Sequence, residues 1–289
     1  MTTSDASHTD ELLFTVEGGI ARLTLNRPQA RNALTFGMYQ GLIDACARIE
    51  AEGRVKALVI AGAGEKAFAA GTDIAQFRSF TSAQDAIDYE RFMDRVMGAL
   101  ERLSVPTIAA IAGACTGGGA AIAAACDLRL ATRDARLGFP IARTLGNCLS
   151  LGNLRRLSAL IGPARVKDMI FTARLVGAEE ALAIGLVGEV VTDAEALAAR
   201  ATELATLVAG HAPLTLRATK EGLRRLQDTD DAGQDHLGQD HSGQDRSGQD
   251  HLSQDRPGDD LIRLCYTSAD FREGMEAFLA KRPPAWTGR

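Results

Sequence analysis

The sequence predicts an α/β domain followed by a helical C-terminal part. Short apolar runs alternate with segments of helical period over most of the chain, as expected for a parallel sheet covered by helices. Helical patterns dominate the later part. The chain has 289 residues, 46% of them apolar, which is enough to bury a sizeable core. We therefore expect a globular protein.

The chain opens with a predicted β-hairpin. Two runs of alternating apolar and polar residues flank Glu17-Gly18-Gly19, and glycine accepts the positive φ that such a turn requires. The two runs are Leu12–Val16 and Ile20–Leu25.

Strands and helices then alternate. Thr35 and Ser82 each precede a segment of helical period and can cap a helix, because their side-chain oxygens accept from the free N–H groups of a first turn. Short apolar runs that end at a turn residue predict buried strands. The expected elements are helices from Thr35 to about Glu52 and from Ser82 to about Leu103, strands at Val55–Ala61, Thr107–Ala112 and Asp127–Thr132, a glycine-rich helix at Gly117–Ala125, mostly helix up to about Leu226 with Pro163 in a first turn, and a short strand near Val187–Val191.

Five tandem copies of a five-residue unit interrupt the helical region, and they read GQDHL, GQDHS, GQDRS, GQDHL and SQDRP. A period of five fits neither helix nor strand, and almost no apolar side chains are available to bury. We predict a disordered insert at 228–259. Its histidines and aspartates do not predict a metal site, because ordering a flexible loop around an ion costs entropy. The predicted organisation is a disordered tail at 1–10, an α/β core at 11–200 and a helical region at 201–289 that contains the insert.

Composition and charge exclude several classes of protein. The net charge is −5 with lysine and arginine spread along the chain, so no basic patch predicts nucleic-acid binding. The first ten residues lack a secretory signal, and no apolar run approaches the roughly 18–20 residues of a membrane span, which predicts a cytoplasmic protein. The five cysteines form no CxxC pair, so we interpret them mostly as apolar core residues in a reducing compartment.

The first candidate site segment is Lys66–Phe77, KAFAAGTDIAQF, which directly follows a predicted strand and its glycine turn. Small residues before Thr72 allow a ligand to approach the main chain, and Asp73 can cap the next turn so that N–H groups stay exposed. A plain small-residue turn between a strand and a helix would explain the same pattern.

The second candidate segment is Ile111–Asp127, IAGACTGGGAAIAAACD, with three successive glycines where a strand leads into an alanine-rich helix. A helix N-terminus presents free N–H groups and a positive dipole end to an oxygen that becomes negative. The spacing of a Walker loop and that of GxGxxG are both absent, so nucleotide phosphate is not indicated. Close helix packing is the alternative interpretation.

These segments and four others resemble the crotonase (enoyl-CoA hydratase/isomerase) superfamily, in the same order along the chain. The likeness spans nearly all of the chain except the extreme N-terminus and the repeats. It implies a spiral of ββα turns and a helical trimerisation region, with assembly into homotrimers or dimers of trimers. It also implies a lyase, hydratase or isomerase of fatty acid metabolism. Acyl-coenzyme A is then the substrate, and no separate cofactor is implied. The six motifs are Arg27–Leu34 (RPQARNAL), Phe68–Ile74 (FAAGTDI), Gly117–Asp127 (GGGAAIAAACD), Arg156-Leu157, Val176–Gly185 (VGAEEALAIG) and Ala269–Arg282 (ADFREGMEAFLAKR).

The resemblance implies specific site residues. The backbone N–H groups of Thr72 and Gly118 match an oxyanion hole for the thioester carbonyl. Phe278 and Lys281 match a C-terminal helix that covers the ligand, although Lys281 could equally be a solvated surface lysine. Further coenzyme A or substrate contacts are implied at Gln29, Ala30, Arg31, Ala70, Asp73, Ile74, Gly117, Pro140 and Ile141.

The sequence departs from the family at both positions where hydratases carry a catalytic glutamate. One is Ala121, and the other is Ile141, or Ala142 under a one-residue shift. None of these side chains can move a proton, which argues against hydration by the usual mechanism. The polar residues near these positions do not clearly replace the glutamates as proton donors. For Ser150 and Cys148, capping or packing is a better interpretation than a covalent role.

Three hypotheses follow. The first is an acyl-CoA enzyme that stabilises an enolate without the glutamates, for which decarboxylation is suited. The second is weak or lost hydratase activity. The third is a catalytically silent subunit that binds coenzyme A or fills positions in an assembly.

Overall fold

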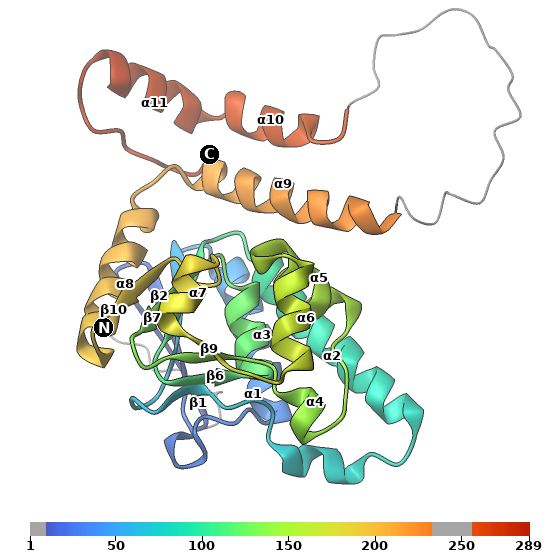
Figure 1. Cartoon of the computed structure of the whole chain (residues 1–289). Helices are drawn as coiled ribbons and strands as arrows, with labels where there is room; N and C mark the ends of the chain where they lie inside the picture. The colour runs from blue at the N-terminus through green and yellow to red at the C-terminus, as the bar shows by residue number, and fades with distance from the viewer. Residues whose placement is uncertain (1–9, 233–255) are drawn as a thin grey trace, which may run out of the picture. The chain divides into compact units, whose positions relative to one another are not determined.

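The computed structural model describes residues 10–232 and 256–289. The chain forms two compact units, Met1–Ala209 and Gly210–Arg289 (Figure 1). The first unit combines strands and helices, whereas the described part of the second is helical. The predicted α/β class is confirmed, and helices follow the sheets toward the C-terminus.

A six-stranded sheet organises the first unit, in the order β1-β2-β3-β5-β7-β10. The predicted hairpin is its antiparallel edge, with Glu17 opposite Ile20 across the turn. The other neighbouring strands run parallel. The strands are β1 (Leu12–Glu17), β2 (Ile20–Leu25), β3 (Ala57–Gly62), β5 (Thr107–Ile111), β7 (Leu128–Thr132) and β10 (Glu189–Val191).

A second sheet of short strands has the order β4-β6-β8-β9. Strands β4, β6 and β8 directly follow β3, β5 and β7, so the chain makes repeated strand–strand–helix turns. These strands escape prediction from the sequence, because segments of two or three residues are too short to establish a period. They are β4 (Ala67–Ala69), β6 (Ala114–Thr116), β8 (Arg136–Gly138) and β9 (Val176–Gly177).

Helices pack on both faces of the large sheet. A large apolar cluster that includes Leu42, Met97 and Ile122 joins one face to helices α1, α2 and α3. On the other face, a second apolar cluster joins strand residues such as Leu130 to Ala201 of α8. The helices of this unit are α1 (Phe36–Glu52), α2 (Ala83–Arg102), α3 (Gly118–Ala125), α4 (Ile141–Thr144), α5 (Leu151–Ile161), α6 (Pro163–Phe171), α7 (Ala178–Ala183) and α8 (Ala194–Ala209), with 3-10 turns η1 (Pro28–Ala30) and η2 (Ile74–Ser79).

The predicted helix caps are present. Thr35 accepts a hydrogen bond from the N–H of Met38 at the start of α1. Ser82 accepts from the N–H of Asp85, whose carboxylate accepts in return from the N–H of Ser82, so α2 begins with a capping box. Each cap stabilises its helix by roughly 1 kcal/mol, which fixes where α1 and α2 begin.

The second unit contains the helices α9 (Pro213–Ala232), α10 (Asp259–Tyr266) and α11 (Ala269–Leu279). Arg225 of α9 makes two hydrogen bonds of 2.8 Å to Asp260 of α10. Buried Asp270 accepts from the backbone N–H groups of Thr287 and Gly288, which holds the C-terminal segment on α11. The predicted disorder of the tail at 1–10 falls mostly on 1–9, outside the described residues. Of the predicted insert at 228–259, residues 228–232 continue α9 and Asp259 begins α10, whereas 233–255 lie outside the described residues. In the part of the chain that is described, no helix has both the length and the apolar character needed to cross a bilayer.

Replacing Asn32 by alanine is expected to lower the free energy of unfolding by about 3 kcal/mol. Its buried side chain accepts from the Arg27 N–H at 3.0 Å and donates to Ala63 O at 3.0 Å and Ala67 O at 2.7 Å. Alanine leaves these groups without partners, and each such loss costs about 1–3 kcal/mol. Urea unfolding measures the change. Asn26→Ala, which removes one exposed hydrogen bond, is the control, and an equal effect of both changes would contradict the prediction.

Candidate functional site

A cavity of about 200 Å³ opens in the first unit. Its walls come from the turn after β4, from α2, from the start of α3 and from the segment that contains α4, with lining residues within 70–77, 89–97, 116–121 and 139–153. Both candidate segments identified in the sequence therefore line the same cavity.

The backbone N–H groups of Thr72 and Gly118 donate to no other group among the described residues, and both residues line the cavity. Thr72 pairs with Leu34 through an isolated bridge, in which Gly71 O and the N–H of Asp73 make the hydrogen bonds. Gly118 is the first residue of α3, where an N–H has no carbonyl within the helix to bind. Both N–H groups are thus available to a ligand.

The two segments meet at glycines. Gly117 has φ 52° and ψ −120°, and Gly71 has φ 103°, values that residues with a Cβ atom rarely adopt. A Cβ atom on Gly117 would lie 3.4 Å from Gly71 Cα, and one on Gly118 would lie 3.2 Å from Thr72 Oγ1. This close approach places Thr72 and Gly118 on the same wall of the cavity.

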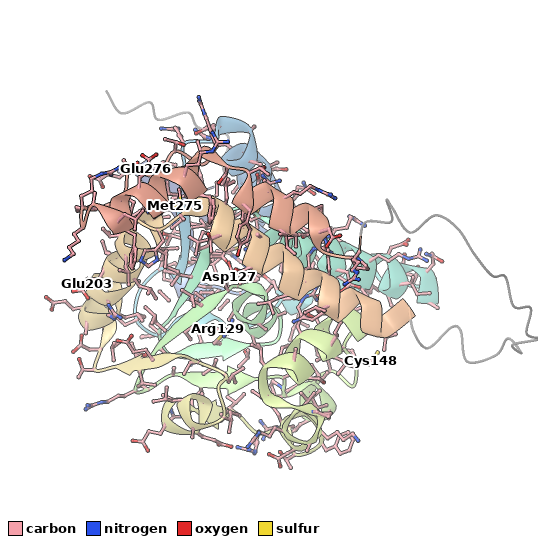
Figure 2. All side chains as sticks on the ribbon, turned by 90° about the horizontal axis from the view of Figure 1, so that it is seen from above. Asp127, Arg129, Cys148, Glu203, Met275 and Glu276 are labelled. Carbon is pink, nitrogen blue, oxygen red and sulfur yellow. The ribbon has the colours of Figure 1, made fainter. Side chains whose placement is uncertain are left out.

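Arg129, near the start of β7, fixes the far end of α3 (Figure 2). Its guanidinium donates to Cys126 O at 2.5 Å and to Ala123 O at 3.4 Å, at the C-terminal end of the helix. Burial lowers the pKa of Arg129 from its ordinary value, while a positive charge at a helix C-terminus is favourable. We infer that this contact keeps Gly118 in position at the other end of α3.

A cluster of hydroxyl groups lies beside these N–H groups. Thr72 Oγ1 is 2.8 Å from Tyr39 Oη and 2.9 Å from Tyr89 Oη. Burial raises the pKa of both tyrosine hydroxyls, most strongly that of Tyr39, whose side chain is fully buried. Both tyrosines are therefore neutral near pH 7. The sequence did not indicate this cluster, because Tyr39 and Tyr89 lie on different helices.

The two positions at which the resemblance implies catalytic glutamates are apolar at the cavity. Ala121 on α3 and Ile141 at the start of α4 are buried and line it, whereas Ala142 is exposed and is not part of the lining. Of the two alternatives left open by the sequence, Ile141 thus faces the cavity. Neither Ala121 nor Ile141 can donate or accept a proton.

The cavity contains one carboxyl group within its lining, Glu90 on α2, which sequence reasoning missed. Burial, and secondarily the negative charge of Asp94, raises the pKa of Glu90 above its usual range, although a hydrogen bond from the Ser150 N–H acts in the opposite direction. A weak sequence signal exists: Glu90 shares a helix face with Met93 and Met97, and a carboxylate on an otherwise apolar stripe is unusual.

Ser150 and Cys148 lie near the cavity but not among its lining residues. Ser150 caps α5 by accepting from the N–H of Asn153, and its hydroxyl donates to Asp94 at 2.8 Å. Cys148 is an exposed free thiol (Figure 2). The capping interpretation of Ser150 is confirmed, but the core interpretation of Cys148 is wrong, because its segment runs along the surface. Cys46, Cys115 and Cys126 are buried as expected.

Of the segments predicted to bind coenzyme A, the one at Gln29–Arg31 lies next to the cavity turn at Ala70. Gln29 and Ala30 belong to the 3-10 turn η1, and Arg31 O accepts from the N–H of Ala70 at 3.0 Å. That hydrogen bond joins the first predicted ligand segment to the cavity turn.

Asp73 lies beside the cavity and not among its lining residues. Its carboxylate accepts from the N–H of Ala75 and from Arg27, and these contacts lower its pKa in that order. Asp73 therefore holds the turn in place. Ile74, Gly117 and Pro140 line the cavity, whereas Phe278 and Lys281 belong to the second unit, where the Phe278 side chain is 83% exposed.

Comparison with known proteins shows the family of the chain. The profile of the enoyl-CoA hydratase/isomerase family matches residues 15–289. The chain is 36% identical over 221 residues to a short-chain-enoyl-CoA hydratase of Clostridium acetobutylicum, covering 76% of this chain and 84% of the relative. It is 32% identical over 273 residues to a crotonyl-CoA hydratase of Syntrophomonas wolfei, covering 94% and 96%.

Solved structures of similar proteins also superpose on this chain. An enoyl-CoA hydratase/carnithine racemase from Magnetospirillum magneticum superposes with a TM-score of 0.83 at 32% identity, covering 97% of each chain. A family protein from Hyphomonas neptunium gives 0.82 at 33% identity, covering 96% of this chain and 98% of that one. The resemblance found in the sequence is confirmed, and the chain belongs to the enoyl-CoA hydratase/isomerase family of the crotonase superfamily.

Proposed function

We propose that this protein is an acyl-CoA enzyme that stabilises a thioester enolate with the backbone N–H groups of Thr72 and Gly118, and that it decarboxylates a 2-carboxyacyl-CoA of the malonyl type. The supporting observation is the combination of these two available N–H groups with the apolar Ala121 and Ile141 at the same cavity. Two preorganised donors favour a developing oxyanion over a neutral carbonyl. A wall without paired carboxylates has no means to activate water by the usual hydratase mechanism.

Decarboxylation needs only what this cavity offers. The bond between C2 and the carboxylate breaks, carbon dioxide leaves, and the electron pair forms the enolate, whose oxygen accepts from Thr72 and Gly118. C2 then takes a proton, for which we assign Glu90, because a carboxyl whose pKa is raised holds its proton closer to neutral pH. Solvent returns a proton to Glu90, which completes the cycle.

The test compares two reactions of the purified full-length chain. We expect conversion of malonyl-CoA or methylmalonyl-CoA to the decarboxylated thioester, followed by mass spectrometry, to exceed hydration of crotonyl-CoA, followed by loss of enoyl-thioester absorbance. Ala121→Glu combined with Ile141→Glu should raise hydration and lower decarboxylation. Faster hydration than decarboxylation by the unaltered chain would contradict the proposal.

Hydration is the second candidate, supported by the names of the relatives and by Glu90, which could serve as a lone acid and base. The same assay separates it, because hydration would then depend on Glu90 in the unaltered chain. Absence of both activities, with acyl-CoA binding intact, would favour a silent coenzyme A-binding subunit.

We also propose that coenzyme A binds along Gln29, Ala30, Arg31 and Ala70, and that the chain forms homotrimers or dimers of trimers, with Phe278 and Lys281 covering the ligand. Exposed apolar side chains on the second unit support self-association, because α9 and α10 contain no buried residues within the parts described. The most exposed are Leu223, Leu226, Ile262, Tyr266, Phe278 and Leu279.

A mass of three or six times the 30.6 kDa chain is therefore expected from light scattering coupled to size exclusion. Replacing Leu226 and Ile262 by serine should reduce that mass, because it removes apolar area from the association surface. Arg91→Ser, at an exposed position of α2, is the control. A monomer before any substitution would contradict the assembly.

A further inference from the structure

The hydroxyl cluster of Tyr39, Thr72 and Tyr89 contains three O–H protons and two hydrogen bonds. The Tyr39 side chain is fully buried, and the acceptors that its hydroxyl reaches are Thr72 and, beyond it, Tyr89. Its proton therefore stays inside the cluster, because a buried hydroxyl without an acceptor would cost about 1–3 kcal/mol. With two bonds made inside the cluster, one proton remains for the cavity, where Thr72 and Tyr89 are lining residues.

Either hydroxyl of each pair can donate. In the head-to-tail arrangement from Tyr39 to Thr72 to Tyr89, the proton left for the cavity is that of Tyr89, whereas donation from Tyr89 to Thr72 would leave the proton of Thr72. Each hydroxyl that accepts a hydrogen bond becomes a better donor, so the chain strengthens its last member. Of the two lining hydroxyls, the phenol of Tyr89 is the stronger acid and the better donor to an oxygen acceptor.

The Tyr89 ring is held in one orientation by phenylalanines. Its centroid is 5.0 Å from that of Phe77, 5.8 Å from Phe36 and 5.9 Å from Phe80. A fixed ring presents its hydroxyl at a defined place, which reduces the entropy lost when a ligand binds. Since Thr72 supplies both a backbone N–H to the cavity and the link to Tyr89, this hydroxyl lies close to where the thioester carbonyl would bind.

We propose that the Tyr89 hydroxyl donates a hydrogen bond to an oxygen on the acyl group near C3, and so selects acyl-CoA substrates that carry a carboxylate on C2 or a ketone at C3 over plain acyl chains. This inference rests on the proposed function, because it requires an acyl-CoA thioester in the cavity. Tyr89 is thus a specificity-determining residue, whereas Tyr39 acts through Thr72 as a positioning residue.

The test uses two ligands that differ only at C3, which is a carbonyl in 3-oxobutyryl-CoA and a methylene in butyryl-CoA, with calorimetry on the full-length protein. The unaltered protein should bind the 3-oxo ligand about tenfold more tightly, the effect of one neutral hydrogen bond. Tyr89→Phe keeps the ring and should remove the preference while leaving the Kd of butyryl-CoA within about twofold. Tyr39→Phe should reduce the preference in part, because Tyr89 can then donate to Thr72.

The outcomes separate the two proposals. If the 3-oxo preference survives in Tyr89→Phe, or is absent from the unaltered protein while butyryl-CoA still binds, the inference on Tyr89 is overturned and the proposed function stands. If neither ligand binds, the proposed function itself fails. A merely structural role of the Tyr89 ring would weaken both ligands equally and would leave their ratio unchanged.

Discussion

Gly118→Ala is expected to lower kcat for the proposed decarboxylation by about 10²–10³-fold, the usual effect of losing one oxyanion donor. An added Cβ atom would lie 1.9 Å from Tyr39 Oη, a distance that no two such atoms can keep. Either Tyr39 or the start of α3 must move, and both movements take the Gly118 N–H away from its place. Steady-state kinetics measures the loss, with circular dichroism to establish that the variant is folded.

A second substitution tests this steric explanation. In Gly118→Ala combined with Tyr39→Phe, the 1.9 Å contact disappears, and the nearest remaining atoms, Tyr39 Cζ and Thr72 Oγ1, lie at 3.2 Å. We expect the double variant to recover at least about tenfold of the lost kcat. Gly37→Ala is the control, since a Cβ atom there has its nearest neighbour at 3.7 Å. No recovery in the double variant would mean that the contact with Tyr39 is not the cause.

Glu90→Gln is expected to lower kcat about 10²-fold with little change in KM, because glutamine keeps the shape of the side chain but cannot transfer a proton. The dependence of kcat on pH distinguishes a proton donor from a merely structural residue more clearly than kcat at one pH. Since burial raises the pKa of Glu90 and the protonated form is the donor, kcat should fall as pH rises through a value above the usual glutamate range. That limb should be missing from the variant.

Asp88→Asn provides a matched control on the same helix. Its carboxylate is exposed and accepts from Gln84 and Arg91, away from the cavity lining. We expect its kcat and pH profile to match those of the unaltered protein. A Glu90→Gln variant with full kcat and the same pH limb would rule out Glu90 as the proton donor.

The sequence predicts the backbone of the site better than its side chains. Small residues around Thr72 and the glycine triplet at Gly117 have local signatures, because close approach and positive φ restrict which residues can stand there. The apolar residues at Ala121 and after Pro140 can also be read from the sequence, because both stand in motifs that carry the resemblance. The alternative between Ile141 and Ala142 needed the structure, because a one-residue shift leaves the motif intact.

Tertiary contacts explain what the sequence leaves out. Tyr39 and Tyr89 meet at Thr72 because α1 and α2 pack together, and neither residue stands in a motif. Glu90 lies in an amphipathic helix, where a charged residue is normally read as solvated. The short strands of the second sheet have no period of their own and form only because the longer strands beside them fix the chain.

The oxyanion hole is tested most simply through the carbonyl stretching frequency of butyryl-CoA bound to the protein, measured by infrared difference spectroscopy with a ¹³C-labelled thioester carbonyl. Two N–H donors at Thr72 and Gly118 should polarise the carbonyl and shift its band to lower frequency than in water. The shift should be reduced in Gly118→Ala. A bound ligand whose carbonyl band remains where it is in water would contradict the proposed enolate-stabilising site.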